Sequence, residues 1–241
     1  MGKGAVVKII PCEQGSEAWY EARLGRPTAS QFHKIVTPTG KPSRQAQGYM
    51  YRLIAETLLH ESMDDYLGSV QWIERGKLLE GDAAAQFEFT HNVELEAVGL
   101  VTTDDGTMAC SPDRLVAGRR AAVEIKCPAP WTHLGYLLDG PGADYRPQVQ
   151  GQLMIGEFEQ VVFYSYHPRC PAAEFVAHRD EPYIRVMRQL LRDFREQLAA
   201  ALDRARALGI FLESHAMQTP MARAYPESGP DPLQVLLGET E

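Results

Sequence analysis

The fold of this chain is decided by residues 109–128, which read ACSPDRLVAGRRAAVEIKCP. Two short apolar runs flank a turn at residues 117–120, so this stretch predicts a β-hairpin. Glu124 and Lys126 lie two residues apart on the second strand and therefore face the same way. Asp113 can lie opposite them, on the partner strand of the hairpin. The hairpin thus predicts two carboxylates that converge beside an ammonium group.

Converging carboxylates are typical ligands of Mg²⁺, which prefers carboxylate oxygens and water. Such an ion offsets the charge on a phosphate under attack, while a lysine can hold and polarise the attacking water. The same spacing also fits a surface hairpin with a salt-bridged lysine. However, Glu124 and Lys126 follow the apolar residues 121–123, and charges on a core strand are costly unless they have a partner or a function. This context strengthens the interpretation as a metal-assisted phosphodiester-cleaving site, while the salt-bridged surface hairpin stays open as the alternative.

The segments around the hairpin alternate between helical and strand patterns. Apolar spacing and capping residues predict helices over residues 17–24, from Thr28 or Ser30 to about Val36, and over 46–59, 70–89, 131–138, 146–155 and 182–208. Strands are expected over residues 94–101, over 108–111 with a continuation through 114–116, and over 121–127, 161–166 and 173–178. This order predicts an α/β (α+β) fold in which a mixed central β-sheet is flanked by helices.

The composition is that of a folded globular protein. Of the 241 residues, 44% are hydrophobic and 23% are charged, which excludes a wholly disordered chain, a coiled coil and a collagen-like chain. No run approaches the roughly 20 apolar residues that cross a bilayer, and no convincing signal peptide or lipid anchor is present. We expect one domain over residues 1–209, an extension of unknown role over residues 210–241, and no membrane association.

The four cysteines do not form a metal-binding pattern. They lie at positions 12, 110, 127 and 170, whereas zinc ribbons and most iron–sulfur sites need closely spaced pairs. We therefore expect buried, reduced thiols, as in a cytosolic protein.

Charge is distributed unevenly along the chain. The net charge is −8, yet residues 1–60 carry eight basic and four acidic side chains, and residues 61–110 carry two basic and eleven acidic ones. A solvated acidic helix would explain this asymmetry. A phosphate-binding face beside a carboxylate cluster that metal ions neutralise would explain it as well.

Several motifs in consistent order make the chain resemble the phage lambda exonuclease, or YqaJ-type viral recombinase, family of alkaline exonucleases. The resemblance spans about residues 12–208. The matching blocks are Glu13-Gln14-Gly15, Ala18-Trp19, Arg23-Leu24-Gly25, Thr28-Ala29-Ser30, Gly76-Lys77 with Glu80, Phe87-Glu88-Phe89-Thr90, Ala109-Cys110-Ser111-Pro112-Asp113, Glu124-Ile125-Lys126-Cys127-Pro128 and Gln148-Val149-Gln150. The hairpin block resembles the PD-(D/E)xK nuclease signature, which implies a restriction-endonuclease-like core.

The resemblance also implies roles for residues at the hairpin. Asp113, Glu124 and the backbone carbonyl of Ile125 would bind metal, and Lys126 would position the attacking water. Glu80 resembles the family's helix-borne carboxylate near the second metal or its water. Gln148 matches the glutamine that lines the site.

A second group of residues is implied to bind DNA. Arg23, Thr28 and Ser30 match the pocket for the 5′-phosphate of the strand being cut; on their own, Arg23 would fit a surface salt bridge and Ser30 a plain N-cap. Lys41 could contact phosphate or be solvated. Ile73 lies where an apolar wedge that splays the duplex end is expected, although Arg75 stands where the family can have an aromatic residue.

The function implied by this resemblance is a Mg²⁺-dependent 5′-to-3′ exonuclease with two ions per site and Mn²⁺ as a possible substitute. It would degrade one strand of linear double-stranded DNA to mononucleotides and leave a 3′ overhang for a single-strand annealing protein. The family also implies a ring-shaped homotrimer that works in the cytoplasm of a bacterial host. The alternatives are a related endonuclease or DNA-repair nuclease, or a non-catalytic module that binds DNA ends.

Overall fold

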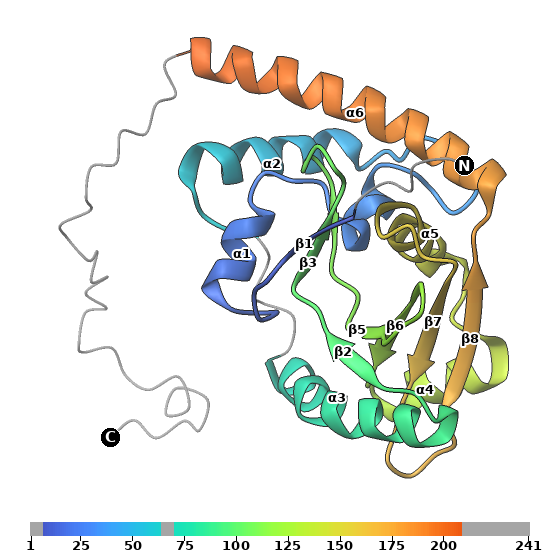
Figure 1. Cartoon of the computed structure of the whole chain (residues 1–241). Coiled ribbons are helices and arrows are strands. Elements are labelled where there is room, and N and C mark those ends of the chain that lie inside the picture. Colours follow the sequence, from blue (N-terminus) through green and yellow to red (C-terminus); the bar gives the residue numbers. More distant parts are fainter. Residues whose placement is uncertain (1–6, 64–69, 209–241) are drawn as a thin grey trace, which may run out of the picture. The chain divides into compact units, whose positions relative to one another are not determined.

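The computed structural model describes residues 7–63 and 70–208, apart from the side chains of residues 70–75 and 77 (Figure 1). The first half contains β1 (Lys8–Ile10), α1 (Glu17–Arg23), the 3₁₀ helix η1 (Ala29–Lys34), α2 (Ala46–Leu59), α3 (Val70–His91), β2 (Leu95–Ala97), β3 (Leu100–Thr102) and β4 (Ala109–Cys110). The second half contains β5 (Arg114–Val116), β6 (Ala121–Lys126), α4 (Pro130–Asp139), η2 (Ala143–Tyr145), α5 (Arg146–Ile155), β7 (Gln160–Ser165), β8 (Ala173–His178) and α6 (Glu181–Ala207).

A five-stranded mixed sheet forms the centre of the fold. Its strand order is β2-β5-β6-β7-β8, in which β6 and β7 are parallel and the other neighbours are antiparallel. The predicted hairpin is present as β5 and β6, and the predicted mixed sheet flanked by helices is confirmed. A separate antiparallel sheet, in the order β1-β3-β4, was not expected from the sequence. The expected continuation of the strand at 108–111 into 114–116 is therefore wrong, because β4 and β5 belong to different sheets.

Helices cover both faces of the central sheet (Figure 1). On one face, Phe87 of α3 packs in a cluster with Val123 and Ile125 of β6. On the other face, Leu153 of α5 packs with Ala122. Because side chains alternate along a strand, Glu124 is directed to the same face as Ala122, toward α5.

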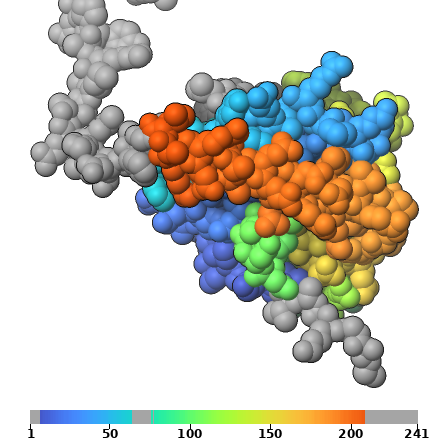
Figure 2. Space-filling view, turned by 90° about the horizontal axis from the view of Figure 1, so that it is seen from above, coloured from blue at the N-terminus to red at the C-terminus, as the bar shows by residue number. Residues whose placement is uncertain are grey.

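The long helix α6 packs against α2. Asp180 caps its N-terminus by accepting a hydrogen bond from the Tyr183 amide. Its apolar seam is buried, as the spacing predicts, and Phe194 stacks on Tyr49 of α2 at 5.8 Å between ring centroids. Figure 2 shows α6 lying across this face of the molecule beside α2. No helix among the described residues is long and apolar enough to span a bilayer.

The expected strand over residues 94–101 is wrong as one element. It is divided between β2 in the central sheet and β3 in the small sheet. The division falls at Gly99, where a Cβ atom would lie 2.3 Å from the carbonyl oxygen of Cys12. The N-terminal segment therefore approaches the chain too closely for a side chain there.

The expected helix from residue 28 or 30 to about 36 is also corrected. A 3₁₀ helix forms instead over Ala29–Lys34, and neither Thr28 nor Ser30 caps it with a side-chain bond; Thr28 pairs with Ala109 as an isolated parallel bridge. Val36 bridges Pro42, and Ile35 accepts a hydrogen bond from the Ser43 amide. Because residues 35 and 36 pair with residues 42 and 43, they are not part of the helix.

The first helix is confirmed with its caps. Ser16 Oγ accepts a hydrogen bond from the Trp19 amide at 3.3 Å. Gly25 follows the last turn with φ +64°, and a Cβ there would lie 2.0 Å from Thr57 Oγ1. Glycine is therefore required where α1 ends.

Candidate active site

The β5–β6 hairpin brings the predicted charged residues together. Arg114 pairs with Val123, so the preceding residue, Asp113, lies opposite Glu124. Lys126 Nζ donates a hydrogen bond to Glu124 Oε1 at 2.5 Å. Glu124 is buried at 2% exposure, whereas Asp113 and Lys126 are half-buried. The arrangement therefore matches the one that the two-residue spacing predicts.

Backbone and side-chain contacts fix Asp113 toward β6. Its Oδ2 accepts a hydrogen bond from the Ile125 amide at 2.6 Å. Burial and the nearby charge of Glu124 raise the pKa of Asp113 above its usual range, although Lys126 partly opposes this shift. Burial lowers the pKa of Lys126, but the two carboxylates raise it further, so the ammonium group stays charged. The hairpin thus holds two mutually repelling carboxylates beside one cation.

Helix α5 supplies two amide donors to Glu124. Gln148 Nε2 donates to Glu124 Oε1 at 2.6 Å, and Gln152 Nε2 donates to Oε2 at 2.5 Å. The sequence predicts Gln148 at the site, and the structure places it there. Gln152 was not predicted, although its position one helical turn after Gln148 is a signal that could have identified it.

Helix α3 brings Glu80 to the edge of the site through an arginine. Arg114 Nη1 donates to Glu80 Oε1 at 2.7 Å and to the backbone carbonyl of Asp113 at 2.6 Å. Glu80 also contributes to the raised pKa of Asp113. Its carboxylate is therefore close enough to act electrostatically on Asp113 while it is paired with Arg114.

The N-terminal residues form a second polar cluster. Arg23 Nη2 donates to Thr28 Oγ1 at 3.5 Å, and Thr28 Oγ1 lies 3.3 Å from Ser30 Oγ. The Arg23 guanidinium lies over the Trp19 ring, 4.1 Å from its centroid. The structure therefore brings together the three residues predicted for a phosphate pocket.

This cluster is joined directly to the hairpin. Trp19 Nε1 donates to Ser111 Oγ at 3.0 Å, two residues before Asp113. The Thr28–Ala109 bridge forms a second link, and Gln14 Nε2 donates to the carbonyl of Pro112 at 2.8 Å. The opening motif of the sequence thus supports the loop that carries Asp113.

A cleft borders the N-terminal segment and the edge of the site at Glu80 and Arg114, but Asp113, Glu124 and Lys126 are not among its lining residues. Its volume is about 720 Å³, and residues 12–16 line it together with Trp19, Glu80 and Arg114. It gives solvent access to the edge of the site that Glu80 and Arg114 form.

The two remaining predicted DNA-binding residues are Lys41 and Ile73. Lys41 is exposed on the loop after η1, and its backbone amide donates to Thr37 Oγ1. The Tyr183 hydroxyl of α6 donates a hydrogen bond to the Thr37 carbonyl in that loop at 2.9 Å. The backbone of Ile73 belongs to α3, but its side chain lies outside the described residues, so the wedge stays a prediction.

The donor set fits a Mg²⁺ site with few protein ligands. No cluster of three or more histidine, cysteine, aspartate or glutamate side chains occurs among residues 7–63 and 70–208 that could hold a metal ion. Mg²⁺ keeps several waters and is commonly held by one or two carboxylates, and a divalent cation would relieve the repulsion between Asp113 and Glu124. Asp113, Glu124 and the Ile125 carbonyl therefore fit such an ion, whereas Glu80 is engaged by Arg114.

The cysteines form no disulfide in the structure. All four are free, and Cys110 is fully buried beside the hairpin. The other three cysteines are half-buried, so the expected burial is found for Cys110 alone.

Comparisons with known proteins show which family and fold the chain resembles. Residues 18–159 match the YqaJ-like viral recombinase domain. The alkaline exonuclease LHK-Exo from Laribacter hongkongensis is 27% identical with a TM-score of 0.71, and its complex with dAMP is 29% identical with the same score; each match covers 80% of this chain and 98% of the other. A phage-related exonuclease from Haemophilus somnus 129PT is 14% identical with a TM-score of 0.58, and the match covers 74% of this chain and 96% of the other. At this identity the match supports the fold alone. Curated protein sequences give no match.

Proposed function

The chain belongs to the YqaJ-like viral recombinase family, and from this premise we propose that it is a Mg²⁺-dependent 5′-to-3′ exonuclease acting on linear double-stranded DNA. The family and the alkaline exonuclease relatives support a nuclease role. The enzyme would release mononucleotides from one strand and leave a 3′ single-stranded overhang. That product suits recombination by single-strand annealing, so the proposal includes an annealing protein as partner and a homotrimeric ring.

The link between the phosphate cluster and the hairpin is the observation that carries this proposal. Arg23, Thr28 and Ser30 offer a guanidinium and two hydroxyl groups, which suit a terminal phosphate. The Trp19–Ser111 hydrogen bond holds this cluster next to the loop that leads to Asp113. An enzyme that binds a terminal 5′-phosphate next to its cleavage site would cut from the 5′ end.

The residues of the hairpin have distinct roles in the proposed reaction. Asp113, Glu124 and the Ile125 carbonyl would hold Mg²⁺, with Glu80 nearest to a second ion. Bound Mg²⁺ would supply neutralisation of the phosphate and leaving-oxygen charge. Lys126 stays protonated, so it would orient the attacking water and stabilise developing negative charge rather than remove a proton. Gln148 fixes the Glu124 oxygen that Lys126 also contacts.

The experiment compares linear duplexes that are blocked at one end and labelled separately on each strand. With Mg²⁺ we expect loss of the 5′-ended strand as mononucleotides, faster from a 5′-phosphate than from a 5′-hydroxyl. Chelator should stop the reaction, Mn²⁺ should restore it, and Ca²⁺ should support little cleavage.

Four outcomes would contradict the proposal. Digestion from 3′ ends would reverse the polarity, and full activity in excess chelator would remove the metal. Cutting of covalently closed circular duplex would favour the endonuclease alternative, and binding of ends without cleavage would favour a non-catalytic module.

A further inference from the structure

Gln152 lies in the last turn of α5 and contacts the hairpin from inside the protein. It is 1% exposed, and its Nε2 donates to Glu124 Oε2 at 2.5 Å. Gln148, one turn earlier, donates to the other oxygen of the same carboxylate. The two amides therefore hold Glu124 from one helix face, and Gln152 reaches it from the buried side.

The other end of the Gln152 amide is unsatisfied. Its Oε1 is buried and has no hydrogen-bond partner in the part of the chain that the structure describes. A buried acceptor without a partner costs about 1–3 kcal/mol. Rotating the amide would not remove the problem, because Oε1 would then face the Glu124 carboxylate, which only accepts hydrogen bonds.

A buried group that lacks a partner needs an explanation in the function of the site. An apolar side chain of similar size would avoid the unsatisfied oxygen but would release Glu124 Oε2. We propose that Gln152 is a positioning residue that orients the Glu124 carboxylate for binding a divalent cation. This inference rests on the proposed function. Gln152 itself is buried and would touch neither the ion nor the DNA.

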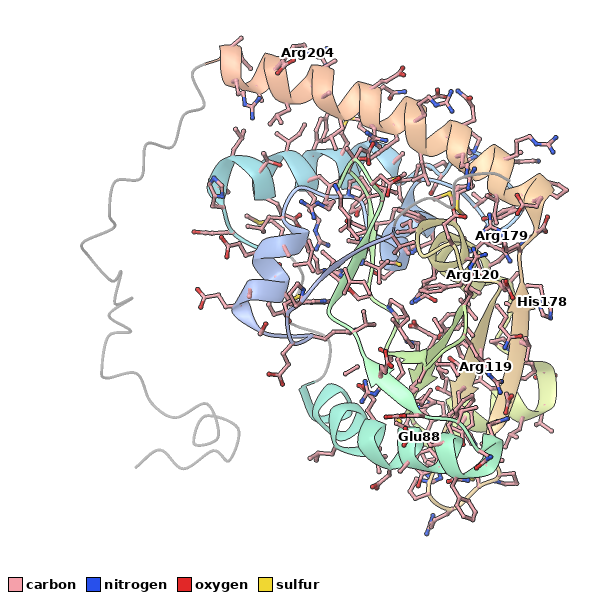
Figure 3. The ribbon with its side chains drawn as sticks, viewed as in Figure 1. Glu88, Arg119, Arg120, His178, Arg179 and Arg204 are labelled. Carbon is pink, nitrogen blue, oxygen red and sulfur yellow. The ribbon has the colours of Figure 1, made fainter. Side chains whose placement is uncertain are left out.

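Gln150 provides a matched control on the same helix. It is also buried, at 6% exposure, but its Nε2 donates to the His178 carbonyl and its Oε1 accepts from the Asp180 amide, both at 2.9 Å. His178 and Arg179 lie where β8 ends and the chain enters α6 (Figure 3). Replacing Gln150 therefore removes a buried glutamine from α5 without removing a bond to Glu124.

The test measures Ca²⁺ binding by calorimetry on the full chain, together with the melting temperature and the Mg²⁺ dependence of turnover. Gln152→Met should weaken Ca²⁺ binding by about tenfold or more, as expected for loss of a group that orients a ligand. The Mg²⁺ concentration for half-maximal turnover should rise in parallel. Gln150→Met should lower the melting temperature but leave Ca²⁺ affinity within about twofold, because hydrogen bonds to Glu124 are kept.

If Gln152→Met does not fold, Gln152→Asn serves as a second variant, since its shorter amide withdraws from Glu124 while staying polar. A folded Gln152 variant that binds Ca²⁺ as tightly as wild type would overturn the inference, as would equal weakening in Gln150→Met. Wild-type protein that binds no divalent cation would instead contradict the proposed metal-dependent function. The two failures are therefore distinguishable.

Discussion

Lys126 combines a charged ammonium group with a direct bond to a buried carboxylate. Its proposed effect is on the water in the transition state, so Lys126→Ala should lower turnover by about 10²–10⁴-fold, the range typical of a lost proton-transfer or water-orienting group. Binding of DNA ends in Ca²⁺ should change little. Single-turnover cleavage and equilibrium binding would measure the two effects separately.

Lys8→Ala is the matched control, because Lys8 donates to the Asp104 carbonyl in the small sheet and lies on an exposed surface. It should retain wild-type turnover. Lys126→Ala could instead lose affinity for DNA and keep its cleavage rate at saturating DNA. That result would show that the lysine binds DNA rather than the attacking water.

Arg23 carries the proposed preference for a 5′-phosphate. A charge-assisted hydrogen bond to phosphate contributes about 1.5–3 kcal/mol, which corresponds to roughly ten- to a hundredfold in rate. Arg23→Ala should therefore remove most of the preference for 5′-phosphorylated over 5′-hydroxyl ends, without changing Ca²⁺ affinity. The measurement is the ratio of degradation rates on matched duplexes, with the exposed Arg44→Ala as control. A ratio unchanged in Arg23→Ala would remove this residue from the pocket.

The packing of α5 against η1 connects the two halves of the site. Gly151 makes this approach possible, because a Cβ there would lie 2.6 Å from Phe32 Cδ2. Gly151→Ala should therefore destabilise the protein by about 1–3 kcal/mol through overpacking. Gly135 of α4 has open space around its Cα, so Gly135→Ala should instead stabilise by about 0.5–1 kcal/mol through helix propensity.

Urea denaturation of both variants would measure these opposite signs. A Gly151→Ala protein as stable as wild type would show that α5 and η1 can separate without cost. In that case the positions of Gln148 and Ser30 on these two elements would be less tightly coupled than the packing indicates.

Local periodicity accounts for the elements that were predicted correctly. The spacing of Met50, Leu53 and Ile54 indicates α2, and the seam of α6 is equally regular, so their bounds agree closely with the sequence predictions. Glu124 and Lys126 were predicted to face one way because strand periodicity alone decides it.

Contacts between distant segments account for what was missed. The small sheet depends on pairing of β1 with β3 across about 90 residues, which no local pattern signals. The Trp19–Ser111 bond and the Gln152–Glu124 bond are likewise long-range. The need for glycine at position 99 likewise arises only from its contact with Cys12, which is distant in the sequence.

Stability and metal binding are opposed in the molecule as a whole. Asp113 and Glu124 repel each other, so Asp113→Asn should raise the stability of the metal-free protein while keeping an acceptor for the Ile125 amide. Removing a repulsion of about 1 kcal/mol should raise the melting temperature by roughly 2–4 °C at this chain length. Ca²⁺ should raise the melting temperature of wild type and not that of Asp113→Asn. Scanning calorimetry with and without Ca²⁺ tests both statements, and a metal-free Asp113→Asn that melts below wild type would contradict the first.

Charge segregation governs how an acidic protein can bind DNA. The chain has a net charge of −8, yet residues 1–60 carry a surplus of basic side chains. Arg23 and Arg26 from this part line one pocket beside Thr28, where Arg52 is already paired with Glu56 at 3.1 Å. Burial lowers the pKa of Arg26, as expected for a partly desolvated cation. Binding should therefore be focused on this surface, and it should weaken steeply with salt despite the acidic pI.

If Arg23 and Arg26 neutralise two phosphates, the affinity should fall with a log–log slope of about −1.8, or about twelvefold between 50 and 200 mM salt. Fluorescence anisotropy with a labelled duplex end in Ca²⁺ would measure the slope. Arg26→Ala should reduce its magnitude by about one, because one fewer phosphate is neutralised. A flat salt response in wild type would show that phosphates are not the main contacts, and the charge surplus of residues 1–60 would then need a different partner.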